Sequence, residues 1–148
     1  MTEVQWELVC VACGAAYPGL QLRYRCDCGG TLNVVHNRTA TTISGLETFD
    51  QRLLSKGRLD RSGVWRFREL VLPLDEEYVV SRGEGNTNLY GSPKLARYVG
   101  LDALALKHEG ENPTGSFKDR GMTTGISVAK ALGMSRVAVA STGNTSAS

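Results

Sequence analysis

The chain has 148 residues, 41% hydrophobic and 22% charged, a composition typical of a globular protein and unlike a disordered or low-complexity segment. The net charge of +2 gives no electrostatic reason to expect nucleic-acid or membrane binding. No apolar run approaches the roughly 20 residues that span a bilayer, and the acidic N-terminal stretch lacks the features of a secretory signal. We predict a cytoplasmic protein that binds neither nucleic acid nor membranes.

The four cysteines all lie within the first thirty residues, in the spacing C-x2-C followed by C-x-C. They are Cys10, Cys13, Cys26 and Cys28. Short strands expected over 4–9 and 20–25 lead into the two pairs, which places each pair on a glycine-bearing turn. Four thiolates on facing turns favour a tetrahedral, structural zinc site in a reducing compartment, with a metal-free turn or disulfides as alternatives. We interpret His36 as a surface residue, because such a site needs no fifth ligand, and we expect a zinc-ribbon-like module over 1–35.

Residues 36–80 are expected to connect and frame the remainder of the chain. Apolar residues at helical spacing predict one amphipathic helix between the glycines at 45 and 57. These residues are Leu46, Phe49, Leu53 and Leu54. The segment 63–74 interleaves aromatic and arginine side chains, which is compatible with a nucleic-acid surface. We favour a packed segment in which Trp65, Phe67 and Leu70 face a core.

Residues 81–148 alternate between turn-forming loops, helices and strands. A helix capped by Ser92, with Pro93 in its first turn, is expected to end at Gly100. The further elements expected are a strand within 101–108, a loop over 109–115, a helix up to Gly133, a buried strand over 136–140, a loop over 141–145 and the start of another helix. This order predicts an α/β fold with a parallel sheet and covering helices.

Two loops of this predicted fold fall at the carboxyl ends of neighbouring strands, where ligands bind in such folds. Lys118 opens the helix after the first loop, where the helix dipole and Arg120 favour a neutral amine that can attack an aldehyde. The second loop offers polar groups suited to a carboxylate or phosphate. Its polar side chains are Ser141, Thr142, Asn144 and Thr145. An exposed lysine and a helix cap are each common alone, so it is their pairing at one sheet edge that favours function.

Two segments carry a resemblance to a known family. The sequence EGENPTGSFKDRG over 109–121, together with ASTGNTSAS over 140–148, resembles the fold type II pyridoxal-phosphate enzymes, the tryptophan synthase β class, and within it the threonine synthase family. The segments 63–69 and 83–87 and the cysteine-rich N-terminus are also similar to that family, so the resemblance covers nearly the whole chain. Asn88 stands where the family usually has proline.

The resemblance implies specific roles for these loops. Lys118 matches the lysine that binds pyridoxal phosphate covalently, and Asn144 matches the asparagine that donates to the phenolic oxygen of the cofactor. Ser141, Thr142 and Thr145 match the loop, shared with Asn144, that holds the substrate carboxylate. The implied reaction converts O-phosphohomoserine and water into threonine and phosphate. Other fold type II enzymes, such as threonine dehydratase or cysteate synthase, and a zinc-ribbon binding module without catalysis are the alternatives.

The family places its ligands for the cofactor phosphate and the pyridine nitrogen later in the chain than the loop of Asn144. Since this sequence ends at Ser148, we expect an N-terminal fragment of a longer enzyme, inactive by itself and compatible with a homodimer at full length. Within it we expect three parts: the cysteine-rich module over 1–35, the framing segment over 36–80 and the start of the cofactor-binding domain over 81–148.

Overall fold

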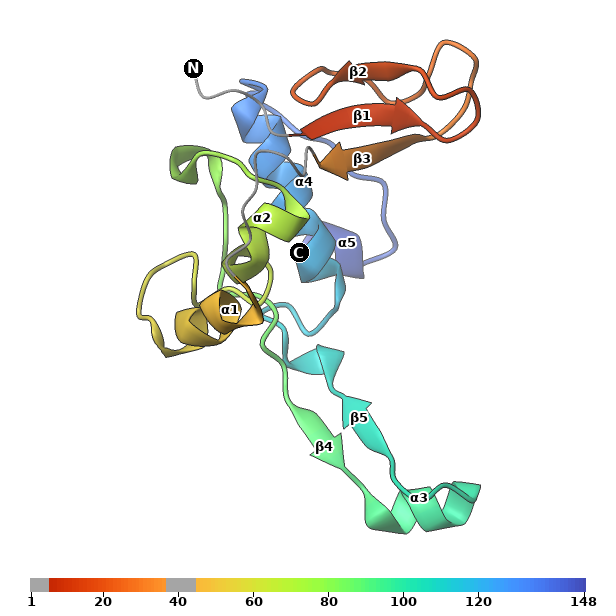
Figure 1. Ribbon diagram of the computed structural model, residues 1–148, viewed down its shortest axis with the longest axis vertical. Helices are drawn as coiled ribbons and strands as arrows, with labels where there is room; N and C mark the ends of the chain where they lie inside the picture. The colour runs from red at the N-terminus through yellow and green to blue at the C-terminus, as the bar shows by residue number, and fades with distance from the viewer. Residues whose placement is uncertain (1–5, 37–44) are drawn as a thin grey trace.

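The computed structural model describes residues 6–36 and 45–148 (Figure 1). The N-terminal part is a three-stranded antiparallel sheet with the order β2-β1-β3. Its strands are β1 (Trp6–Cys10), β2 (Ala16–Pro18) and β3 (Leu32–His36). The first predicted strand is confirmed with slightly shifted bounds, but residues 20–25 contain no strand, so the prediction of a second strand there is wrong.

The side chain of Arg23 explains why residues 20–25 do not form a strand. Its guanidinium carbon lies 4.0 Å from the centroid of the Tyr17 ring, and its Nη1 donates to Asp27 Oδ1 at 2.7 Å. These contacts fold the segment back over β2 in place of a ladder of strand hydrogen bonds. The third strand of the sheet is supplied instead by residues that follow the second cysteine turn.

The centre of the molecule is a small apolar core around Trp65, whose side chain is completely buried. The core residues are Trp6, Leu59, Val64, Trp65, Leu72 and Val79, so the first strand and the framing segment are packed together. Around them lie α1 (Gly45–Leu54), η1 (Trp65–Phe67), α2 (Arg68–Val71) and η2 (Glu76–Tyr78). Phe67 is half-buried against Phe49, with ring centroids 5.0 Å apart. Burial of Trp65 is confirmed, whereas Leu70 is 50% exposed and does not face the core as predicted.

The predicted helix in the framing segment is α1, but only one of its four apolar side chains is buried. Phe49 is 5% exposed, whereas the other three are more than half exposed. Those three are Leu46, Leu53 and Leu54. The helix meets the rest of the molecule along one turn, through Phe49 and through Arg52, which donates to both carboxylate oxygens of Glu69 at 2.5 and 2.8 Å.

The longest helix, α4 (Lys118–Ala131), packs a polar stripe against the core. Asp119, Thr123 and Ser127 are spaced four residues apart, so they lie on one face of the helix, and all three are buried. Thr123 Oγ1 accepts from Trp65 Nε1 at 2.7 Å and donates to the carbonyl of Val80, while Ser127 Oγ accepts from the backbone N–H of Val80 at 2.9 Å. These bonds satisfy the buried hydroxyls and fix the chain just before residue 81.

A narrow arm projects from this body and carries a helix at its tip (Figure 1). The arm consists of β4 (Leu89–Gly91), α3 (Pro93–Val99) and β5 (Ala105–Lys107), with the two strands antiparallel. Ser92 Oγ accepts from the backbone N–H of Leu95, and Gly100 ends the helix with φ +74°, so the predicted caps are confirmed. None of the helices within residues 6–36 and 45–148 has the length and apolar character needed to cross a membrane.

The predicted parallel sheet is not formed within the described residues, so the fold is a mixed α/β arrangement with two small antiparallel sheets. The strand expected within 101–108 is β5, and it pairs with β4 through an antiparallel hairpin. Residues 136–140 form no strand and are exposed, because no neighbouring strand lies beside them in this part of the chain. The helix predicted after residue 141 is α5 (Asn144–Ala147).

Candidate cofactor site and metal centre

Lys118 is the first residue of α4, and its side chain is exposed. Its backbone N–H donates to Ser116 Oγ at 3.2 Å, which satisfies one of the free donors at the start of the helix. The ammonium group lies 4.6 Å from the centroid of the Phe117 ring. No ion pair holds it among the residues that the structure describes, so the amine is accessible to a small molecule.

Asp119 accepts two hydrogen bonds that hold the loop leading into Lys118. The buried carboxylate accepts from the backbone N–H of Thr114 at 2.9 Å and from Thr114 Oγ1 at 2.5 Å. Burial acts to raise the pKa of Asp119, but hydrogen bonds from Thr114 and Ser148 outweigh it and lower that pKa below its ordinary value. The loop is therefore fixed to the first turn of the helix that carries the lysine.

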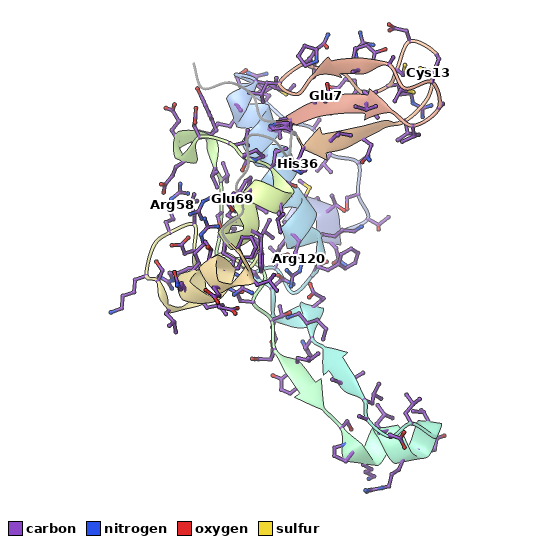
Figure 2. All side chains as sticks on the ribbon, in the orientation of Figure 1. Glu7, Cys13, His36, Arg58, Glu69 and Arg120 are labelled. Atoms are coloured by element: carbon purple, nitrogen blue, oxygen red, sulfur yellow. The ribbon has the colours of Figure 1, made fainter. Side chains whose placement is uncertain are left out.

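The same loop is tied to α4 from its other end by an ion pair. Arg120 donates to both carboxylate oxygens of Glu109, at 2.8 and 2.9 Å, and Glu109 also accepts from Thr87 Oγ1 and Asn112 Nδ2 at 3.0 Å. The guanidinium of Arg120 and these further donors lower the pKa of Glu109 to about 2. Figure 2 places Arg120 where the arm joins the body. The positive charge of Arg120 is thus paired with the carboxylate of Glu109.

Asn88 has a structural role that the family's usual proline does not allow. Its backbone N–H donates to Glu111 Oε2 at 2.7 Å, and proline has no such donor. Tyr90 Oη donates to the other oxygen of Glu111 at 2.5 Å, and these bonds lower the pKa of Glu111 to about 2. The departure from the family pattern therefore anchors β4 to the loop before Lys118.

The second predicted loop, over 141–145, is largely exposed. Ser141, Thr142 and Asn144 are exposed and Thr145 is half-buried, with α5 beginning at Asn144. Ser141 Oγ accepts from the backbone N–H of Gly143 at 3.1 Å. The amide side chain of Asn144 has no hydrogen-bond partner among the described residues, so it is free to bind a ligand.

One contact joins the first loop to the end of α5, the helix that begins within the second loop. Thr114 Oγ1 lies 3.3 Å from Ser148 Oγ, and α4 and α5 are in contact. Within residues 6–36 and 45–148 no hydrogen bond links Lys118 to the segment 141–145. Asp119 and Thr114, which connect the first loop to α4 and to the end of α5, were not predicted. Their only signal in the sequence is an acidic residue in the first helical turn beside the candidate lysine.

The four cysteine thiols form one cluster at the end of the three-stranded sheet. Cys10 Sγ and Cys28 Sγ are 3.6 Å apart, Cys13 Sγ and Cys26 Sγ are 3.5 Å apart, and all four sulfurs lie within 4.8 Å of one another. Tetrahedral zinc with Zn–S bonds of about 2.3 Å requires sulfur separations of about 3.8 Å, so the cluster fits this ion in size and in ligand type. The cysteines are not paired as disulfides.

His36 lies outside this cluster, as interpreted from the sequence, but it is half-buried and is not the surface residue that was expected. It pairs with Trp6 at one end of the β1–β3 ladder, whereas Cys10 pairs with Leu32 at the other end. Figure 2 shows His36 and Cys13 well separated along the sheet. The four sulfurs are therefore the complete set of candidate metal ligands in the described residues.

The cysteines differ in how readily they lose a proton. A hydrogen bond from Tyr17 Oη, 3.1 Å from Cys26 Sγ, together with the backbone N–H of Cys28, lowers the pKa of Cys26 to about 6. Backbone donors at Cys13 and Ala12 lower the pKa of Cys10 as well. Thiolates are the form that binds metal, so these donors prepare two of the four sulfurs for an ion.

Comparison with known proteins gives the class of the protein first. Residues 80–148 match the family described as pyridoxal-phosphate dependent enzymes. This stretch contains Lys118, both loops and the helix between them. Over these residues the chain is therefore similar to pyridoxal-phosphate dependent enzymes, and its own small sheets stand in a mixed α/β arrangement.

Within that class, several curated relatives are threonine synthases. The chain is 43% identical over 139 residues to the threonine synthase of Methanocaldococcus jannaschii, which covers 94% of the chain and 33% of the relative. It is 43% identical over 143 residues to that of Methanosarcina acetivorans, covering 96% and 33%, and 50% identical over 78 residues to that of Mycobacterium leprae, covering 52% and 21%. The chain spans about a third of the length of the first two relatives, and the resemblance to threonine synthase is confirmed.

Proposed function

We propose that the chain supplies the cofactor-binding lysine and the substrate loop of a threonine synthase, which converts O-phosphohomoserine and water into threonine and phosphate. The observation that carries the proposal is the exposed amine of Lys118 at the start of α4, beside a loop fixed by Asp119. The similarity to threonine synthases over almost the whole chain supports the same activity.

The residues present fit pyridoxal phosphate. Lys118 offers an unpaired amine for its aldehyde, and the free amide of Asn144 can donate to its phenolic oxygen. When bound, this cofactor supplies an electron sink that stabilises negative charge on the substrate carbons. Asn144 would orient the ring through a hydrogen bond worth about 0.5–1.5 kcal/mol, which is far weaker than the covalent link through Lys118.

The remaining steps fall to groups of this chain. The hydroxyls of Ser141, Thr142 and Thr145, with nearby backbone N–H groups, would bind the α-carboxylate of the substrate. The Lys118 amine would remove a proton from Cα and then one from Cβ, so that phosphate can leave Cγ. It would return protons to Cγ and Cα, and water would add at Cβ. Asp119 would act as a positioning residue, because it fixes the loop that precedes the lysine.

Substrate choice tests the proposed reaction against other members of the class. The full-length protein with pyridoxal phosphate is expected to release phosphate and threonine from O-phosphohomoserine, and Lys118→Ala should abolish both. Lys130→Ala, an exposed lysine on the same helix, is the matched control and should stay active. Ammonia release from threonine without phosphate release from O-phosphohomoserine would instead favour the threonine dehydratase alternative and contradict the proposal.

We also propose that the cysteine cluster holds one structural zinc ion, and that the protein is cytoplasmic and forms a homodimer at full length. The zinc assignment is supported by the sulfur separations and by the free thiols. The three-part division at 1–35, 36–80 and 81–148 stays a prediction.

Elemental analysis tests the metal. Purified protein is expected to contain about one zinc per chain, and Cys13→Ser should lose the ion and at least about 2 kcal/mol in the free energy of unfolding. Val11→Ser changes a side chain that is 67% exposed on the same turn and should keep the zinc. Four titratable thiols and no metal in protein purified under reducing conditions would disprove the assignment.

A further inference from the structure

We propose that the protein has an anion-binding pocket for inorganic phosphate or a phosphate monoester, formed by residues outside both predicted cofactor loops. An open hollow of about 550 Å³ lies between the turn over 56–61 and the turn over 81–83. Every side chain that lines it is basic or a small polar group. The lining residues are Lys56, Arg58, Arg61, Ser81, Arg82 and Gly83.

The charges in this pocket are available to a ligand. Arg58 has an acidic partner, Glu76, at 3.5 Å, but both side chains are at least half exposed, so this pair is weak. Among the described residues no carboxylate lies within ion-pair distance of Lys56, Arg61 or Arg82. Four cationic groups around one hollow repel one another, and an anion that binds there relieves this repulsion.

The two walls of the pocket are held at a fixed separation by Glu84. This side chain is 2% exposed, and its carboxylate accepts from Ser62 Oγ at 2.5 Å on one wall. On the other wall it accepts from Ser81 Oγ at 3.0 and 3.1 Å and from the backbone N–H of Arg82 at 2.9 Å. The carboxylate of Glu84 thus accepts hydrogen bonds from both walls and is buried, so it does not line the pocket.

Further bonds make the walls rigid. Asn86 Nδ2 donates to the carbonyl of Arg61 at 3.0 Å, and the backbone N–H of Gly63 donates to the carbonyl of Glu84 at 2.6 Å. Arg58 donates to the carbonyls of Val79 and Glu76, each 3.0 Å from a guanidinium nitrogen, so it contributes charge to the pocket and leaves Arg61 and Arg82 to donate to a ligand. A tetrahedral oxyanion fits a preformed site of this kind, because arginine guanidinium groups donate pairs of hydrogen bonds to its oxygens.

Calorimetric titration of the purified full-length protein with inorganic phosphate, at constant ionic strength, tests the proposal. Saturable binding is expected, and Arg61→Gln and Arg82→Gln should each weaken it by about tenfold or more, as loss of a charged hydrogen bond predicts. Arg97→Gln removes the same charge from an exposed site on α3 and should leave the affinity within about twofold. A phosphate monoester titrated in parallel distinguishes the two forms of the ligand by their relative affinity.

Three results would overturn the proposal. The first is that phosphate shows no saturable binding, and the second is that the affinity for phosphate is unchanged in both Arg61→Gln and Arg82→Gln. The third is that Arg97→Gln loses as much affinity as those two variants, which would show a diffuse effect of net charge. Circular dichroism of each variant confirms that it is folded. The two arginine variants separate this pocket from the proposed catalytic site, which would also bind phosphate as a product. Because Arg61 and Arg82 lie outside the loops of Lys118 and Asn144, phosphate bound at the catalytic site would keep its affinity in both variants.

Discussion

Single charged residues near Lys118 determine how well its loop is ordered. Glu109 and Asp119 both accept several hydrogen bonds, and both have a pKa below the ordinary value. A carboxyl group whose pKa is lower in the folded state than in the unfolded state stabilises the fold only while it is ionised. These two residues therefore link the order of the candidate site to pH.

Replacing Glu109 tests this link. The pKa of Glu109 falls from 4.5 to about 2 on folding, so its stabilisation is complete above 4.5 and is lost as the pH falls toward 2. Glu109→Gln should lower the free energy of unfolding by about 1–2 kcal/mol at neutral pH and by less at about pH 3. Denaturant titrations at the two pH values measure the difference.

Glu77→Gln provides the control, because Glu77 is exposed and forms no ion pair within the described part of the chain. Its effect on the free energy of unfolding should be small. A constant deficit for Glu109→Gln across the same pH range would show that the ion pair with Arg120 does not account for the stabilisation.

The sequence was enough to predict the candidate lysine and the helix cap, but not the buried polar residues that hold the loops in place. Lys118 follows a recognisable loop and Ser92 is a typical cap, so local patterns were enough. Glu84 is flanked by Gly83 and Gly85, both with positive φ, yet nothing in that pattern indicates that its carboxylate is buried. Such a position depends on partners far away in the sequence, such as Ser62.

At the scale of elements, α4 connects the core to both loops through its buried polar face. Thr123 bridges Trp65 and Val80, and this one hydroxyl satisfies two buried groups. Apolar periodicity predicted the helix correctly through Ile126 and Ala129. It could not predict that hydroxyl groups would face the core, since helical periodicity alone places polar residues on the solvent side.

Removing the Thr123 hydroxyl should lower the free energy of unfolding. Thr123→Val keeps the shape of the side chain but leaves Trp65 Nε1 without its partner and removes the shorter of the two side-chain hydrogen bonds to the Val80 carbonyl. We expect a loss of about 1–3 kcal/mol in the free energy of unfolding. Thr124→Val is the matched control, because the Thr124 hydroxyl donates only to the Gly121 carbonyl of the same helix. Equal effects of the two substitutions in thermal or denaturant unfolding would contradict this account.

At the scale of the molecule, the arrangement of strands was the least predictable feature. Residues 136–140 have the composition of a buried strand, yet strand pairing depends on which other segment lies beside them. The four cysteines, in contrast, are close in sequence and gather locally, so their cluster was predictable. The chain spans 33% of the length of its two archaeal relatives, and its complete activity is therefore a property to test in the full-length protein.

The assignment of Lys118 is the central claim, and lysine mapping tests it most directly. The sequence contains five lysines: Lys56, Lys94, Lys107, Lys118 and Lys130. Incubation of the full-length protein with pyridoxal phosphate, reduction with borohydride and peptide mass spectrometry would identify the modified residue. We predict that, among these five, the pyridoxyl group is attached to Lys118 and that Lys118→Ala leaves the other four unmodified. A label on any of those four while Lys118 remains unmodified would contradict the account.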